Sequence, residues 1–99
     1  MTNQQEFFQR LTELKGGIPE PLHETTAVLS YEVGKMMEQA MYLFWFGYDP
    51  TRIGFYKSEV IDAIAQLVLI CESLGINFEE MKVFGIEKAL ERFTGKEKK

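Results

Sequence analysis

Apolar residues recur at helical spacing in four stretches of the chain, and the alternation typical of strands is never sustained. The first stretch begins at Asn3, where Glu6 follows three residues later as in a helix capping box. Its apolar stripe ends at Gly16, and residues 16–24 contain two prolines that disfavour helix. We therefore expect an N-terminal helix followed by a connector.

The second predicted helix begins near Thr25 or Thr26 and continues to about Phe46, where Gly47 stops it. Its apolar residues form a wide stripe on one side: Val28, Leu29, Val33, Met36, Met37, Ala40, Leu43 and Phe44. A helix with such a stripe needs a partner that covers it.

The third predicted helix has two alternative starts. One is at Pro50, because Asp49-Pro50 is typical of an N-cap followed by proline at the first helical position, and the other is at Ser58. From Val60 to Leu74 the helix is apolar on nearly every side, so it must be covered on every side. One chain of four helices offers few partners for that, which favours a homodimer or a higher homo-oligomer.

The fourth predicted helix begins at Asn77, with Glu80 three residues on, and ends at Gly95. The pattern predicts an all-α fold, a four-helix, bundle-like subunit whose core is completed by oligomerisation. We expect one domain over residues 1–99, made of an N-terminal helix and connector (1–24), a core (25–95) and a frayed tail (96–99).

Composition excludes several classes of function. With 11 basic and 15 acidic side chains the formal charge is −4, which argues against a nucleic-acid partner. Cys71 is the single cysteine and His23 the single histidine, so one chain forms no disulfide and no site with two imidazoles. No apolar run predicts a membrane span and no secretory signal is evident, so we expect a cytoplasmic protein. The chemistry left is that of carboxylates, whose oxygens suit Mg²⁺ or Mn²⁺.

Four charged residues of the second and third helices are predicted to meet. In an antiparallel hairpin, two residues lie opposite each other when the mean of their residue numbers falls at the centre of the turn. The pair Glu32 and Asp62 and the pair Lys35 and Glu59 both have their midpoint at Gly47. A turn at residues 47–50 therefore brings the four side chains to one level, whereas a loop as far as residue 58 would displace Glu32 by about two turns.

Three segments, LSYEVGKMMEQA (29–40), SEVIDAIAQLVLI (58–70) and SLGINFEEMKVFGIEKALERF (73–93), resemble the MazG-type all-α NTP pyrophosphohydrolase family. The resemblance spans roughly residues 26–93. That family carries an EExxE motif on one helix and an ExxD motif on the next. The resemblance implies that these acids bind Mg²⁺, which holds the triphosphate of a nucleotide while water cleaves between its α and β phosphates. The implied products are a nucleoside monophosphate and pyrophosphate.

Residue by residue, Glu59 and Asp62 match the ExxD motif in full, and Glu32 matches the second acid of EExxE. Tyr31 and Lys35 stand where the family has its first and third acids. Two interpretations follow. In one, Glu32, Glu59 and Asp62 hold Mg²⁺ or Mn²⁺ and Lys35 contacts a phosphate of an NTP or dNTP. In the other, Lys35 replaces the metal, and the chain binds a nucleotide or a protein partner without cleaving it.

Further candidates lie outside the acids. Lys88 and Arg92 are four residues apart on the last helix, where family members often place a lysine and an arginine to meet phosphates. The alternative, which we favour, is that both are solvated charges paired with Glu91 and Glu87. Trp45 belongs to an aromatic run on which a nucleobase could stack, although such side chains also serve core and interface packing.

Overall fold

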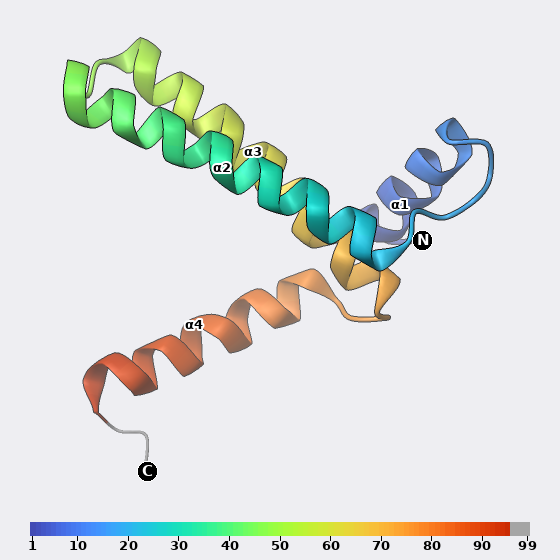
Figure 1. Cartoon of the computed structure of the whole chain (residues 1–99). Coiled ribbons are helices and arrows are strands. Elements are labelled where there is room, and N and C mark those ends of the chain that lie inside the picture. The colour runs from blue at the N-terminus through green and yellow to red at the C-terminus, as the bar shows by residue number, and fades with distance from the viewer. Residues whose placement is uncertain (96–99) are drawn as a thin grey trace.

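The computed structural model describes residues 1–95, which form four helices. They are α1 (Asn3–Leu14), α2 (Leu22–Phe46), α3 (Pro50–Ser73) and α4 (Phe78–Thr94). The described residues contain no strand, so the prediction of an all-helical chain is confirmed. Helices α2 and α3 pair lengthwise as an antiparallel hairpin, α1 lies at the end opposite the hairpin tip, and α4 leaves the end of α3 (Figure 1).

The first helix is capped one residue earlier than predicted. The Thr2 hydroxyl accepts a hydrogen bond from the Gln5 amide, and the Gln5 side chain accepts one from the Thr2 amide. The pairing of Asn3 with Glu6 was therefore wrong. Threonine followed by glutamine three residues later is itself a capping-box pattern, and it satisfies two of the amides that a helix start leaves free.

The second helix begins at Leu22, three residues before the predicted start at Thr25. Its N-cap is Pro21, whose carbonyl accepts from the amides of Glu24 and Thr25. Proline has its φ angle already set near the helical value, so it starts a helix without a capping side chain. The Thr25 hydroxyl thereby becomes free for a different contact.

The connection between α2 and α3 is short, as the first of the two alternatives predicts. Gly47, with φ of +102°, ends α2, and the Asp49 carboxylate caps α3 by accepting from the Arg52 amide at 3.0 Å. The alternative start at Ser58 is wrong, because α3 is already helical from Pro50. The hairpin register is consequently that of a turn at residues 47–49.

Helix α4 is held at its start by α1. The Gln4 amide nitrogen donates to the Ile76 carbonyl at 2.6 Å, and the Gln4 oxygen accepts from the Phe78 amide at 2.8 Å. Asn77 caps α4 and Gly95 ends it in the left-handed conformation, both as predicted. Beyond this anchored start, α4 extends away from the hairpin (Figure 1). The predicted frayed tail at 96–99 lies outside the described residues.

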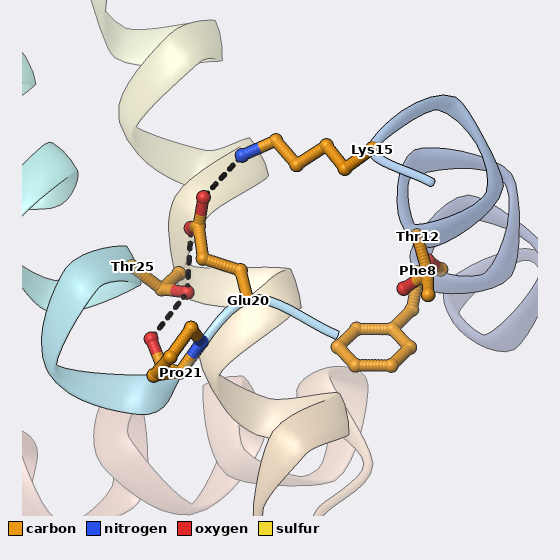
Figure 2. A network of polar contacts seen from close by, with 6 residues as sticks. All are labelled: Phe8, Thr12, Lys15, Glu20, Pro21 and Thr25. Carbon is orange, nitrogen blue, oxygen red and sulfur yellow. Dashed lines mark hydrogen bonds and ion pairs between the residues drawn. The ribbon is translucent and has the colours of Figure 1, made fainter. Parts of the chain in front are cut away.

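A buried hydroxyl links the end of α1 to the start of α2 (Figure 2). Thr25 is 1% exposed, and its hydroxyl donates to the Glu20 carboxylate at 2.7 Å. The same carboxylate forms an ion pair with Lys15. The Lys15 contact, and after it the Thr25 hydrogen bond, hold the pKa of Glu20 below its ordinary value, although burial opposes them. The Glu20 carboxylate thus holds the two ends of the connector together by contacting Lys15 on one side and Thr25 on the other.

Thr25→Val should lower the free energy of unfolding by about 2 kcal/mol, because a buried hydrogen bond to a charged group is lost while the side-chain shape is kept. Thr26→Val is the matched control, since the exposed Thr26 hydroxyl donates, among residues 1–95, to the Leu22 carbonyl of its own helix. Urea unfolding followed by circular dichroism measures both. Equal midpoints for the two variants would contradict a stabilising role for the Thr25 contact.

One chain covers little of its apolar surface. Among residues 1–95 the buried hydrophobic side chains are Leu43, Ala63 and Leu69. Ile61, Ile64 and Leu67 of α3 are exposed. The other helices of one chain therefore do not cover α3 on every side, as its apolar sequence predicts that it should be covered. No helix in the described part of the chain has the length and hydropathy to cross a membrane.

Candidate acidic site

The hairpin brings the four predicted charged residues together. Glu32 and Lys35 come from α2, and Glu59 and Asp62 come from α3. One carboxylate oxygen from each of the three acids lies within 4.8 Å of the others. The meeting depends on the short turn after Gly47, because it sets the register in which these positions face each other.

Lys35 is the cation of this cluster. Its ammonium nitrogen lies 3.3 Å from Oε2 of Glu59 and 3.9 Å from Oε2 of Glu32. The side chains of Glu32 and Glu59 are 13% and 14% exposed, whereas that of Lys35 is 39% exposed. Both contacts are ion pairs, although within the described residues neither Oε2 atom has a partner in strict hydrogen-bond geometry.

The surrounding charges keep Lys35 protonated. Its contact with the Glu59 carboxylate raises the pKa of Lys35 above the ordinary value, and the charge of Glu32 acts in the same direction against partial burial. The ammonium also lies 5.5 Å from the centre of the Tyr31 ring, a cation–π distance. The lysine is therefore a permanent positive charge at neutral pH.

The donor set fits a hard divalent cation. With the acids ionised, three carboxylates against one ammonium leave two uncompensated negative charges, of which Asp62 contributes one at an exposed position. The buried oxygens of Glu32 and Glu59 have the Lys35 ammonium at ion-pair distance, so a divalent cation at this position would take the place of that contact. Carboxylate oxygens at this separation are the ligands that Mg²⁺ and Mn²⁺ prefer.

An open pocket of about 330 Å³ follows the site toward the hairpin tip. It is lined by Gln39, Tyr42, Phe46, Arg52 and Phe55. Helical spacing places the α2 members on the same face as Lys35 and the α3 members on the same face as Glu59. Gln39 and Arg52 were not predicted from the sequence as site residues. Gln39 follows Lys35 by four residues and Arg52 precedes Glu59 by seven, and this helical spacing is the signal that could have identified them.

The remaining candidates lie apart from the acids. Lys88 forms an ion pair with Glu91 at 3.6 Å on its own helix, and the part of α4 that carries Lys88 and Arg92 runs away from the hairpin (Figure 1). Trp45 is exposed near the hairpin tip, with its ring centre 6.4 Å from that of Tyr42. Ten residues of helix, about 15 Å, separate Trp45 from Lys35.

In comparisons with known proteins the chain matches no family model, no curated protein and no solved structure. The likeness to the MazG-type family therefore rests on the motif residues and on the segments around them.

Proposed function

We propose that the chain is a Mg²⁺- or Mn²⁺-dependent nucleoside triphosphate pyrophosphohydrolase. The reaction is attack of water on the α-phosphorus, with cleavage of the bond to the α,β-bridging oxygen, so that an NTP or dNTP gives a nucleoside monophosphate, pyrophosphate and a proton. Such an activity is of the house-cleaning type, which removes unwanted nucleotides. The observation that carries the proposal is the convergence of Glu32, Glu59 and Asp62, which each bring a carboxylate oxygen to within 4.8 Å of the others.

In this proposal the three acids would hold the metal, which supplies neutralising charge for the triphosphate. Lys35 stays protonated because its pKa is raised, and it would contact a phosphate oxygen as a positive point charge. The pocket lined by Tyr42, Phe46 and Phe55 would take the base, since aromatic rings stack on nucleobases. Trp45 would extend this aromatic surface, and Lys88 and Arg92 would serve the phosphates only if α4 approached the hairpin.

Release of pyrophosphate tests the proposal. The purified chain should cleave at least one member of a panel of the standard and the damaged NTPs and dNTPs in Mg²⁺ or Mn²⁺, and EDTA should stop the reaction. Release of pyrophosphate, in place of inorganic phosphate, identifies the bond that is cleaved. No turnover with any nucleotide in either metal would overturn the proposal.

A second candidate function rests on Lys35 itself. Its ammonium lies within 4 Å of both Glu32 and Glu59, the distance of an ion pair. In this alternative the lysine is the permanent counterion in place of a metal, and the chain binds a nucleotide or a protein partner without hydrolysis. Nucleotide binding that is unchanged by EDTA, without turnover, is the result that this alternative expects.

A further inference from the structure

Lys35 stands against two buried oxygens of the acidic site. Its ammonium lies 3.3 Å from Oε2 of Glu59 and 3.9 Å from Oε2 of Glu32, and both oxygens are shielded from solvent. The two carboxylates are thus neutralised in part by a charge of the chain itself, before any metal binds.

The side chain of Lys35 is able to leave these oxygens. It is 39% exposed, against 13% for Glu32 and 14% for Glu59, so solvent reaches the lysine much more than the acids. Four flexible carbons carry the ammonium, and the exposed Tyr31 ring, whose centre is 5.5 Å away, gives it a second favourable contact. The positive charge can therefore move while the backbone of α2 stays in place.

A metal ion and the ammonium exclude each other at the acids. A divalent ion held by Glu32 and Glu59 would contact the carboxylates that Lys35 now neutralises, and two cations at such a short distance repel each other. Lys35 then has to move out and lose both ion pairs. With a metal alone this loss is not compensated, whereas a phosphate group bound beside the metal gives the ammonium a new anionic partner.

We infer that Lys35 is an exchangeable counterion, which makes the binding of the metal and the binding of a polyphosphate cooperative. The ammonium rests on Glu32 and Glu59 in the free chain and moves to a phosphate when metal and polyphosphate bind together. Coupling between two ligands is reciprocal, so each raises the affinity for the other by the same factor. The site thus takes up the metal together with the polyphosphate and discriminates against the free metal ion.

This inference rests on the proposed function, because it takes Glu32, Glu59 and Asp62 as the metal ligands. It adds a role that belongs to Lys35, a residue that stands where the resembled family has an acid. An acid at position 35 would strengthen binding of the free metal, whereas the lysine weakens it until a phosphate is present.

Binding of Mn²⁺ to the full chain, with and without inorganic tripolyphosphate, tests the inference. Tripolyphosphate carries the phosphates without a base, so the result does not depend on base preference. Electron paramagnetic resonance measures the free Mn²⁺, and the complex of Mn²⁺ with tripolyphosphate in solution is included in the fit. The coupling factor is the Kd of free Mn²⁺ for the chain alone, divided by its Kd for the chain with tripolyphosphate bound.

Lys35→Met removes the charge at the site, and Lys57→Met is the matched control. Lys57 is exposed and precedes Glu59 by two residues, so it points about 200° away from Glu59 around α3. We expect Lys35→Met to bind Mn²⁺ alone several-fold more tightly than the unmodified chain does. Its coupling factor should be at least about tenfold lower, because the displaced charge and the phosphate contact are both gone.

The control should stay within about twofold of the unmodified chain in both quantities, since its charge is lost outside the site. Circular dichroism checks that both variants keep their helical content. Equal coupling factors in the unmodified chain and Lys35→Met would overturn the inference, as would an equal effect of Lys57→Met or a chain that binds no Mn²⁺.

Pyrophosphate release from nucleotides, measured separately, decides on the proposed function. A chain that shows the coupling through Lys35 but releases no pyrophosphate would refute the proposed function alone. A chain that releases pyrophosphate, with the same coupling factor in Lys35→Met, would refute this inference alone.

Discussion

Glu59→Gln should reduce pyrophosphate release at least about 100-fold, because it removes a charged metal ligand that no other residue of the site replaces. Asp62→Asn should act in the same direction. The chain should stay folded, since Glu59 loses only one ion pair, with the partly exposed Lys35, and such pairs contribute about 1 kcal/mol or less. Steady-state kinetics in saturating Mg²⁺ and thermal unfolding in EDTA measure the two effects separately.

Glu38→Gln is the control for Glu59→Gln. Glu38 is an exposed acid of α2 that follows Glu32 by six residues and so points about 120° away from it. Its loss should leave turnover within about twofold of the unmodified chain, since it changes the net charge but not the site. Equal losses of activity in the two variants would show that net charge, and not the geometry of the acidic site, controls the reaction.

Lys35→Glu should separate the two interpretations of the site. It replaces the ammonium near Glu32 and Glu59 with a fourth carboxylate, so the bare chain should bind Mn²⁺ at least about tenfold more tightly, because affinity rises with the number of charged ligands. Turnover of the nucleotide should nevertheless fall at least about tenfold, since the contact with a phosphate is lost. Calorimetric titration with Mn²⁺ and kcat/KM for the best nucleotide measure the two effects.

Lys35→Met is the companion variant, because it removes the charge of Lys35 and adds no ligand. It should lower turnover like Lys35→Glu while raising the Mn²⁺ affinity less. A Lys35→Glu variant that gains turnover would show that the lysine blocks the metal, as the second candidate function requires. A variant that binds Mn²⁺ more weakly would show instead that Lys35 itself supports the metal site.

The meeting of the acids could be predicted from the sequence because it depends on local signals. Gly47 and the Asp49-Pro50 pair each specify a turn by their own backbone preferences, and a short turn leaves one register for the hairpin. That register alone places Glu32 level with Asp62 and Lys35 level with Glu59. The competing start at Ser58 rested on capping preference alone, and the helix already formed by Pro50 overrides it.

Features that depend on tertiary contacts were not predictable in the same way. The early start of α2 at Leu22 uses Pro21 as the N-cap, and the Thr25 hydroxyl instead contacts Glu20 of the connector. The direction of α4 is set at its start by Gln4, a polar residue 74 positions away from Phe78. No periodicity in the sequence encodes such a pairing.

The surface left exposed by one chain was predicted only in part. The apolar character of α3 indicates that cover is needed, and the exposure of Ile64 and Leu67 agrees with that need. The sequence could not say how far the other helices cover α3, because this depends on how α1 and α4 pack against it.

A crystal structure of the chain grown with Mn²⁺, with anomalous scattering recorded at the manganese edge, tests the central claim most directly. The account predicts an anomalous peak in contact with carboxylate oxygens of Glu59 and Asp62, with Lys35 moved away from Glu59. Full density for Lys35 in its ion pair with Glu59, and no peak at the three acids in saturating Mn²⁺, would contradict it.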